Sequence, residues 1–199
     1  ATRYLYSNAL WSGHPNTHPV PEAAALGPGN ALDVGCGEGA DAIWLAERGW
    51  QVTAVDLSSV ALERGAAHAL EVGPDLARRI TWLHADLIDW APETSYDLVS
   101  AQFMQLPKDP REVLFQRLAA SVAPAGTLLI VGHHPSDMQT TVPRPPRPEL
   151  FYTAADVAES LGPKEWVTLV SEARPRLTQD PEGRTVTIHD AVLRAPRKC

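Results

Sequence analysis

The stretch Ala31-Leu-Asp-Val-Gly-Cys-Gly-Glu-Gly39 decides the fold of this chain. Three apolar residues, interrupted only by Asp33, are followed by glycines at alternate positions: Gly35, Gly37 and Gly39. Residues 41–48 have the pattern of an amphipathic helix, which Gly49 would end. The glycines therefore lie on a strand-to-helix turn, where glycine permits a positive φ and lets a ligand approach the backbone closely.

This turn suits two kinds of ligand. Gly35-x-Gly37-x-x-Ala40 fits the fingerprint that places a dinucleotide pyrophosphate on a helix N-terminus. Asp33 argues against NAD, because a carboxylate at the end of the strand repels phosphate and attracts a cation. S-Adenosylmethionine carries a sulfonium and an ammonium group and no phosphate, so the pattern favours it. A tight turn with an incidental aspartate is the alternative.

Asp33-Val-Gly-Cys-Gly-Glu-Gly39 resembles the first motif of the class I S-adenosylmethionine-dependent methyltransferases. The resemblance implies an α/β fold with a doubly wound, Rossmann-like, seven-stranded mixed sheet. The implied strand order is 3-2-1-4-5-7-6, with the last strand antiparallel and helices on both faces. The C-terminal pattern is most similar to the small tellurite-resistance-B and thiopurine type. Here Arg174, Pro175 and Arg176 replace the His-Arg pair of the closest enzymes of that type.

The composition indicates one methyltransferase domain over residues 1–199. The chain is 44% hydrophobic and carries a net charge of −7. The acidic balance disfavours nucleic acid as a partner, because nucleic-acid binding depends on a basic face. No apolar run approaches the roughly 20 residues of a membrane helix, and no leader pattern is present. We therefore expect a cytoplasmic protein, a monomer or homodimer, that acts on a small molecule away from the membrane.

Two further acids stand where an adenosine would bind. Residues 51–56 predict the second strand, and Asp56 at its end suits the ribose hydroxyls of S-adenosylmethionine and NAD alike. Its alternative role is to cap the helix predicted over 59–72, for which Ser58 is also suited. Residues 79–84 predict a third strand. The resemblance then implies that Asp86 accepts the adenine amino group and that Leu87 adds a backbone amide and an apolar wall.

Residues 96–101 predict the fourth strand, after which the resemblance places the methionine part of the cofactor. The Asn/Asp-Pro-Pro-Tyr/Phe signature of enzymes that methylate nucleic-acid bases and glutamine is absent from the sequence, which disfavours those substrates. In all, the resemblance implies cofactor contacts from Asp33, Gly35, Cys36, Gly37, Gly39, Asp56, Leu57, Asp86, Leu87, Ala101, Gln102 and Phe103.

His133 and His134 follow the fifth strand, predicted over 127–131, at the ligand edge of the sheet. Because adjacent side chains point in different directions, we expect at most one of them to face the methyl group. A neutral imidazole there would take a proton from a nucleophile or hold the acceptor in line. We interpret the pair as the candidate catalytic residues. Further metal ligands cannot be placed from the sequence, so no metal site is expected.

Two segments are predicted to cover this edge. Residues 1–29 contain Trp11, which we expect either to close on the cofactor or substrate or to pack on the body of the domain. His14 and His18 each precede a proline and are expected at the surface, with a pocket lining as the alternative. Residues 135–150 hold a Pro-rich run, predicted to be a stiff flap with Arg144 over the substrate mouth, or an exposed linker.

The remaining pattern predicts two helices and a hairpin. One helix begins with Asp109 as its N-cap and carries Val113 and Val122 on its apolar side; the other opens with a capping box at Thr153. Strands are predicted over 165–170 and 185–193, with a turn at 180–183. A basic loop, 174–184, lies between these strands and contains Arg176, which we expect to hold an anionic acceptor or to cap the sheet.

These observations predict an S-adenosylmethionine-dependent methyltransferase that releases S-adenosylhomocysteine. The acceptor is expected to be a small molecule that is methylated by in-line displacement. A thiol or chalcogen compound is the candidate acceptor. A hydroxyl or amine acceptor is the first alternative. An NAD-dependent oxidoreductase and a non-catalytic S-adenosylmethionine-binding protein are further alternatives. The oxidoreductase is disfavoured by Asp33 and by the lack of a second, catalytic domain.

Overall fold

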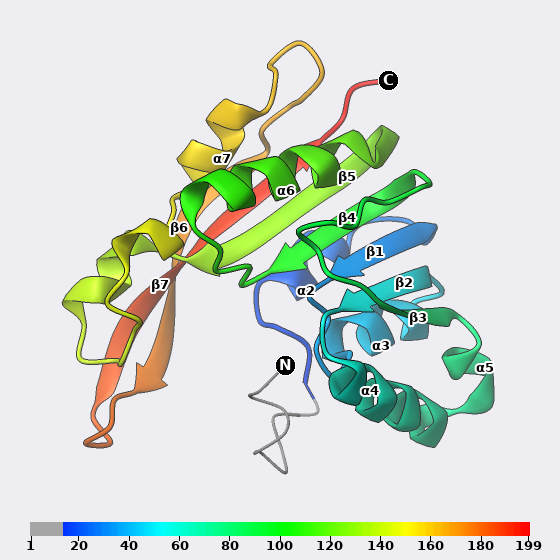
Figure 1. Cartoon of the computed structure of the whole chain (residues 1–199), viewed down its shortest axis with the longest axis horizontal. Helices are drawn as coiled ribbons and strands as arrows, with labels where there is room; N and C mark the ends of the chain where they lie inside the picture. Colours follow the sequence, from blue (N-terminus) through cyan, green and yellow to red (C-terminus); the bar gives the residue numbers. More distant parts are fainter. Residues whose placement is uncertain (1–13) are drawn as a thin grey trace.

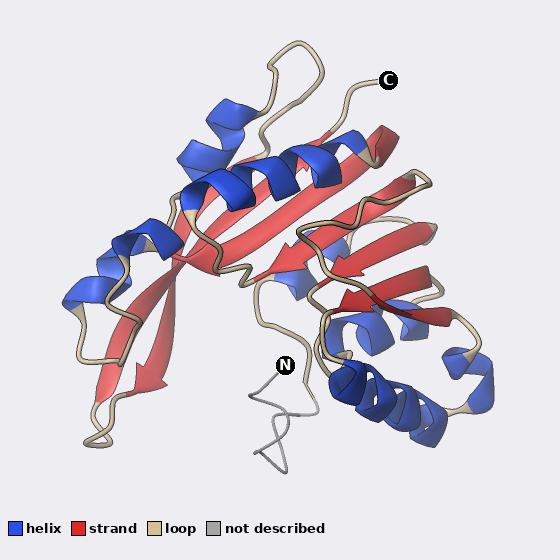
Figure 2. Cartoon of the chain, in the orientation of Figure 1, coloured by secondary structure: helices blue, strands red, loops and turns tan. Residues whose placement is uncertain are grey.

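The first strand is buried on both faces because its side chains alternate between two hydrophobic cores. In the computed structural model, which describes residues 14–199, Leu32 and Val34 of β1 (Asn30–Val34) face one core and Ala31 faces the other. Residues Leu128 and Leu129 of β5 (Val122–His133) divide in the same way. Strands buried on both faces belong to a sheet with a helical layer on each side, as Figure 2 shows.

The strands form one seven-stranded sheet in the order β3-β2-β1-β4-β5-β7-β6 (Figure 1). Strands β1 to β5 pair in parallel, whereas β7 is antiparallel to both β5 and β6. The predicted strand order and the antiparallel strand are therefore confirmed. The other elements are α2 (Pro19–Ala23), α3 (Ala40–Glu47), β2 (Gln51–Asp56), α4 (Ser59–Val72), α5 (Pro74–Ala77), β3 (Ile80–His84), β4 (Tyr96–Gln102), α6 (Lys108–Ala120), α7 (Ala154–Ser160), β6 (Val170–Gln179) and β7 (Thr185–Pro196), with short 3-10 helices η1 (Pro135–Gln139) and η2 (Pro148–Leu150).

The helices divide between the two faces. Side chains of α6 and α7 pack in the core that contains Leu32, and those of α2, α3 and α4 pack in the core that contains Ala31. The strand order reverses between β1 and β4, so the connections that follow these two strands leave in opposite directions. Such a switch point opens a crevice at the carboxyl ends of the strands, which is where open α/β sheets bind ligands.

Several local predictions are confirmed. Helix α4 spans the predicted residues 59–72, and the Ser58 hydroxyl accepts a hydrogen bond from the Ala61 N–H at its start. The predicted capping box is formed by Thr153 and Asp156 at the start of α7. The predicted turn connects β6 to β7, with Asp180 accepting hydrogen bonds from the N–H groups of Glu182 and Arg184.

The prediction for the start of α6 was wrong. The helix begins at Lys108 with Pro107 as its N-cap residue, and Asp109 lies in the first turn without capping it. Val113 is 51% exposed rather than on the buried side. Arg111 is buried instead of Val113, because its guanidinium donates hydrogen bonds to the carbonyl oxygens of Leu106 and Glu149. A charge satisfied by backbone acceptors can take a buried position that periodicity assigns to an apolar residue.

Two strands begin elsewhere than predicted. Val122 belongs to β5, not to α6, because the backbone pairs with Tyr96 before a bulge at residues 123–126. Strand β6 runs from Val170 to Gln179, so most of the predicted basic loop is strand, and the predicted strand 165–170 is largely irregular. The arginines of β6 are compatible with a strand because nearby carboxylates pair with them. Arg174 pairs with Glu22 and Glu172, and Arg176 pairs with Asp190.

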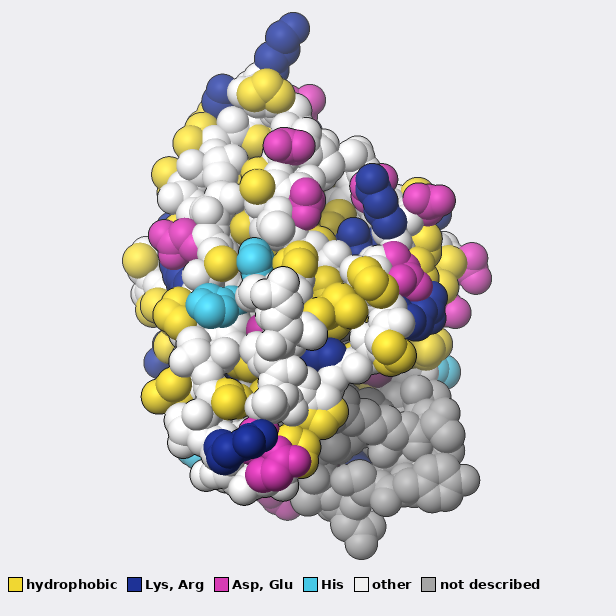
Figure 3. Space-filling view, turned by 90° about the vertical axis from the view of Figure 1, so that its left-hand side faces the viewer, with side chains coloured by type: hydrophobic (Ala, Val, Ile, Leu, Met, Phe, Trp, Pro, Cys, Tyr) yellow, Lys and Arg dark blue, Asp and Glu magenta, His cyan; other side chains and the backbone are white. Residues whose placement is uncertain are grey.

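The surface of the described residues carries mixed charge. On the face shown in Figure 3, Lys and Arg side chains lie in separate places, several of them beside Asp or Glu. Within residues 14–199, no helix combines the length and the hydrophobicity that crossing a membrane requires.

Candidate active site

The glycine turn after β1 requires glycine at each of its alternate positions. Gly35, Gly37 and Gly39 have φ values of +71°, +56° and +81°. A Cβ at Gly35 would lie 2.7 Å from Sδ of Met104, and one at Gly39 would lie 2.3 Å from the ring of Trp82. The turn is therefore both left-handed and tightly packed, and it exposes backbone at the carboxyl edge of the sheet.

Asp33 is a buried carboxyl with an unused acceptor. Its side chain is 1% exposed; the Ala42 backbone N–H reaches it, but Oδ2 has no hydrogen-bond partner within residues 14–199. Burial raises the pKa of Asp33 well above its ordinary value, and the charges of Asp41 and Asp56 raise it further. A cation placed beside Oδ2 would relieve both effects.

Asp41, in the first turn of α3, adds to this negative region. It is buried, and it accepts hydrogen bonds of 2.7 Å from both the backbone N–H and the side-chain amide of Asn16. Burial raises the pKa of Asp41, while the Asn16 hydrogen bonds lower it. Asn16 thereby ties residues 14–18, which we call the strap, to the start of α3.

Asp56 ends β2 and braces the glycine turn. Its Oδ2 accepts the Gly37 N–H at 2.9 Å and its Oδ1 accepts the Ser58 N–H at 2.8 Å. The side chain is half-buried, and Leu57 beside it is 48% exposed. The sequence reading gave a ribose contact and a helix cap as alternatives for Asp56. The structure shows that it orders both the turn and the residue that caps α4, and the ribose contact stays a prediction.

The other residues assigned to the cofactor lie along the same edge. Asp86 is exposed and accepts the Ile88 N–H at 3.0 Å, whereas Leu87 is buried. Ala101 and Gln102 are buried at the end of β4, and Oε1 of Gln102 has no partner in the described part of the chain. Cys36 stays a thiol, because burial raises its pKa and the Asp33 charge raises it further.

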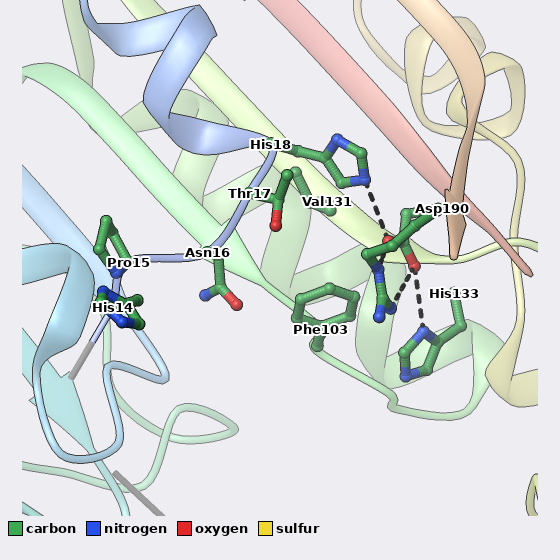
Figure 4. Close-up of a pocket in the computed structure, with 10 residues that line it drawn as sticks. His14, Pro15, Asn16, Thr17, His18, Phe103, Val131, His133 and Asp190 are labelled. Atoms are coloured by element: carbon green, nitrogen blue, oxygen red, sulfur yellow. Dashed lines mark hydrogen bonds and ion pairs between the residues drawn. The ribbon is translucent and has the colours of Figure 1, made fainter. Parts of the chain in front are cut away.

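A cavity of about 490 Å³ lies between the strap, the ends of β4 and β5, and the central parts of β6 and β7 (Figure 4). Phe103 projects into it from a backbone with φ of +54°, in the left-handed region that non-glycine residues adopt only at a conformational cost. Its ring lies 4.8 Å from that of His133, centroid to centroid, at 41°. The lining residues are His14, Pro15, Asn16, Thr17, His18, Phe103, Val131, His133, Arg176 and Asp190.

Asp190 is the centre of this cavity's polar groups. It is fully buried, and three side chains from separate segments reach it: His18 of the strap, His133 of β5 and Arg176 of β6. Burial raises the pKa of Asp190, but the hydrogen bonds from His133, His18 and Arg176 outweigh this and hold it well below its ordinary value. Asp190 is therefore an anion in the folded protein.

The structure separates the candidate catalytic and lid residues. His133 and Arg176 line the cavity, whereas His134 does not and instead accepts the Ser136 N–H at the start of η1. Arg144 pairs with the buried Asp137 at 2.8 Å, and no residue of 135–150 is among those that line the cavity. Trp11 lies outside the described residues.

The pocket lining given as the alternative for His14 and His18 is the one that the structure shows, and His18 is 7% exposed because it binds Asp190. Two other residues that build this cavity were missed in the sequence. Asp190 itself was overlooked in the predicted strand 185–193, although a lone acid within an apolar strand is a signal of a buried partner. Asn16 gave no signal, because its contact with Asp41 depends on how the strap crosses the sheet.

A family comparison agrees with this geometry. Residues 31–126 match the model of the methyltransferase domain. This match and the order of the sheet identify a class I S-adenosylmethionine-dependent methyltransferase domain over these residues. The resemblance inferred from Asp33-Val-Gly-Cys-Gly-Glu-Gly39 is thereby confirmed, and the seven-stranded sheet is the one that this family implies.

Individual relatives match only part of this chain. It is 30% identical over 109 residues to the 2-heptyl-1-hydroxyquinolin-4(1H)-one methyltransferase of Mycobacteroides abscessus, a match to 52% of this chain and 45% of that one. It is 34% identical over 100 residues to the mitochondrial ubiquinone biosynthesis O-methyltransferase of Schizosaccharomyces pombe, covering 50% of this chain and 36% of that one. The matched region therefore spans less than half the length of either relative.

The fold is also that of solved methyltransferase structures. The crystal structure of TehB from Haemophilus influenzae superposes with a TM-score of 0.75 at 21% sequence identity, over 93% of this chain and 63% of that one. The similarity to TehB is a similarity of fold.

Proposed function

We propose that this protein transfers the methyl group of S-adenosylmethionine to an oxygen atom of a small molecule. The observation that carries the proposal is the buried, unpartnered Oδ2 of Asp33 at the carboxyl edge of the sheet. A buried carboxylate beside two further acids suits a cationic ligand and opposes a pyrophosphate. The residues present therefore fit S-adenosylmethionine better than NAD.

The cavity lined by His133 supplies the place for the acceptor. Asn16 also lines it and binds Asp41, whose charge raises the pKa of Asp33. Asn16 thus connects the acidic group to the cavity that contains His133. When bound, S-adenosylmethionine supplies an electrophilic methyl group. The contribution of this chain is to hold the acceptor in line with that methyl group and to exclude water.

Oxygen is favoured as the acceptor atom for two reasons. The Schizosaccharomyces pombe relative is an O-methyltransferase. An imidazole and an ionised carboxylate in the acceptor cavity suit a hydroxyl, which must lose its proton, more than a thiolate, which has already lost it. The thiol or chalcogen acceptor expected from the sequence stays a prediction, and thiols belong in the acceptor screen.

Calorimetry tests the donor. The parent protein should bind S-adenosylmethionine and S-adenosylhomocysteine with micromolar affinity, about −8 kcal/mol, and should not bind NADH. The Asp33→Asn variant should bind S-adenosylmethionine at least about tenfold more weakly, because the amide removes the charge that faces the cation. The matched control Glu71→Gln removes an exposed charge from α4 and should bind like the parent. Binding of NADH alone would overturn the proposal.

A second assay separates catalysis from binding alone. Transfer from S-adenosyl-[methyl-³H]methionine to a panel of phenols, thiophenols and anilines would be counted after extraction. Labelled methyl ether would support the proposed function. Tight donor binding with no labelled product from any panel member would favour the non-catalytic alternative.

A further inference from the structure

Asp190 and His133 face each other across the antiparallel pair of β5 and β7. The two residues are register partners, so the strands place their side chains on the same face of the sheet. Nδ1 of His133 lies 3.4 Å from Oδ1 of Asp190 (Figure 4). The pairing is thus built into the sheet rather than into a loop.

The two oxygens of Asp190 have different partners. Oδ2 accepts from Nε2 of His18 at 3.1 Å and from Nε of Arg176 at 2.8 Å. Oδ1 faces His133, with Nη2 of Arg176 also 3.4 Å away. An ionised carboxylate can only accept hydrogen bonds. On a neutral His133 ring, this contact requires the proton at Nδ1 and leaves a lone pair on Nε2.

We propose that Asp190 is a positioning residue that fixes His133 with Nε2 as the general base toward a phenolic hydroxyl. The inference rests on the proposed function and adds the atom that receives the proton. It uses the same logic as the Ser-His-Asp triad, in which a buried carboxylate selects the imidazole tautomer. The cavity suits an aromatic acceptor because Phe103 and Val131 form its apolar wall next to the His133 ring.

The proposed step is balanced. The acceptor oxygen forms a bond to the methyl carbon while the bond between that carbon and the sulfonium sulfur breaks. The electron pair of the broken bond stays on sulfur. The phenolic proton passes to Nε2 of His133, which becomes an imidazolium beside the Asp190 carboxylate. Water then removes the proton and restores the neutral ring.

A metal site is the competing reading of the same residues. Ligand atoms of His133, Asp137 and Asp190 lie within 4.8 Å of one another. However, Asp190 pairs with Arg176 at 2.8 Å and Asp137 with Arg144 at 2.8 Å. Each carboxylate charge is therefore already offset by a guanidinium, whereas a divalent cation site needs that charge for the metal.

The Asp190→Asn variant tests the tautomer directly. His18 and Arg176 both donate to Oδ2, so the asparagine carbonyl should take that place and turn its amide toward His133. An amide N–H donates, so Nδ1 of His133 should become the acceptor and the proton should move to Nε2. Nitrogen-15 NMR of histidine-labelled protein distinguishes the two tautomers, with His133→Gln used to assign the signal. We expect an Nδ1–H ring in the parent and an Nε2–H ring in the variant.

His18→Gln is the matched control for this measurement. It keeps a donor toward Oδ2 and leaves Oδ1 to His133, so the Nδ1–H tautomer should persist. An Nε2–H ring in the parent would overturn the proposal, and so would an unchanged tautomer in folded Asp190→Asn. The spectra need neither donor nor acceptor, so this outcome is independent of whether the proposed function holds.

Kinetics with matched acceptors test the role in catalysis. Asp190→Asn should lower kcat for phenols by about a hundredfold or more, the usual contribution of a general base, with little change in KM or in methylation of the corresponding thiophenols. An equal loss for both series would indicate a merely structural role and overturn the proposal. Absence of phenol methylation by a parent protein that binds S-adenosylmethionine would also overturn it, while leaving donor binding intact.

Discussion

The carboxyl group of Asp33 lies 1% exposed, with one oxygen unpartnered among residues 14–199 and two further carboxylates nearby. Such an arrangement costs stability in the free protein and is retained at ligand sites, where the ligand offsets the cost. Phe103 shows the same pattern in its backbone, since its positive φ places a ring in the cavity at a conformational cost. Asp33 and Phe103 therefore each carry a local energetic cost beside the proposed ligand sites.

Asp33 should make stability depend on pH. Its pKa is raised in the folded protein, so above the ordinary carboxyl pKa the unfolded chain loses its proton first. The free energy of unfolding should therefore fall as pH rises, by up to about 1.4 kcal/mol per pH unit until the folded pKa is reached. Urea unfolding at several pH values should show a shallower fall for Asp33→Asn. Parallel curves for variant and parent would contradict this prediction.

At the scale of elements, the strap connects the two halves of the site. Asn16 holds it to Asp41 at the start of α3, and His18 holds it to Asp190 on β7. Between these contacts its residues line the cavity. We therefore expect a ligand that leaves through this side to require one of these contacts to open.

The strap contact should set the rate of product release. Asn16→Ala removes the side-chain hydrogen bond to Asp41, and S-adenosylhomocysteine should then dissociate several-fold faster because the strap opens more often. Stopped-flow displacement measures this rate. Asn30→Ala, the same change at the exposed start of β1, is the control and should not alter it. Equal release rates for parent and Asn16→Ala would show that the strap does not gate the site.

The capping box of α7 gives a prediction for stability alone. Thr153→Ala removes the hydroxyl that accepts the Asp156 N–H, which should lower the free energy of unfolding by about 1 kcal/mol. Thr94→Ala, in the exposed loop before β4, should change it by less than about 0.5 kcal/mol. Denaturant midpoints compare the two. A larger effect of Thr94→Ala would contradict the capping assignment.

At the scale of the whole molecule, the sheet is most buried at its centre and least buried at β6. The side chains of β1 and β4 are almost all buried, whereas those of β6 alternate between exposed and half-buried, with Leu177 70% exposed. Figure 1 shows the β6–β7 hairpin extending beyond the other strands. Local opening is therefore expected to concentrate in this hairpin.

Hydrogen exchange should reproduce that gradient. Amides of β1, β4 and β5 should exchange through global unfolding, and those of β6 and the turn at residues 180–184 should exchange orders of magnitude faster. Mass spectrometry of peptic fragments measures both in one experiment. Uniform protection across the sheet would show that the hairpin opens only together with the central strands.

Much of the fold followed from local patterns, because each of β1, β2 and α4 is specified by its own apolar period and end signals. The glycine turn and Asp33 were equally local, so the sequence predicted their place at the carboxyl edge of the sheet. The cavity lined by His133 was not predicted, because its residues meet only through long-range pairing. Asp190 reaches His133 through the register of β5 and β7, and His18 reaches Asp190 across 172 residues. Arg176 was wrongly predicted to lie in a loop, because strand propensity does not take account of its ion pair with Asp190.

The position of β7 has a consequence for biosynthesis. Among the elements of residues 14–199, β7 is synthesised last, yet it inserts between β5 and β6 and brings Asp190 to the cavity. The contacts of the glycine turn with Asp56 lie within residues 33–58 and are available before β7 is translated, whereas His133 gains its carboxylate partner only with β7. In the order of synthesis, the residues of the proposed donor site therefore precede the completion of the proposed acceptor site.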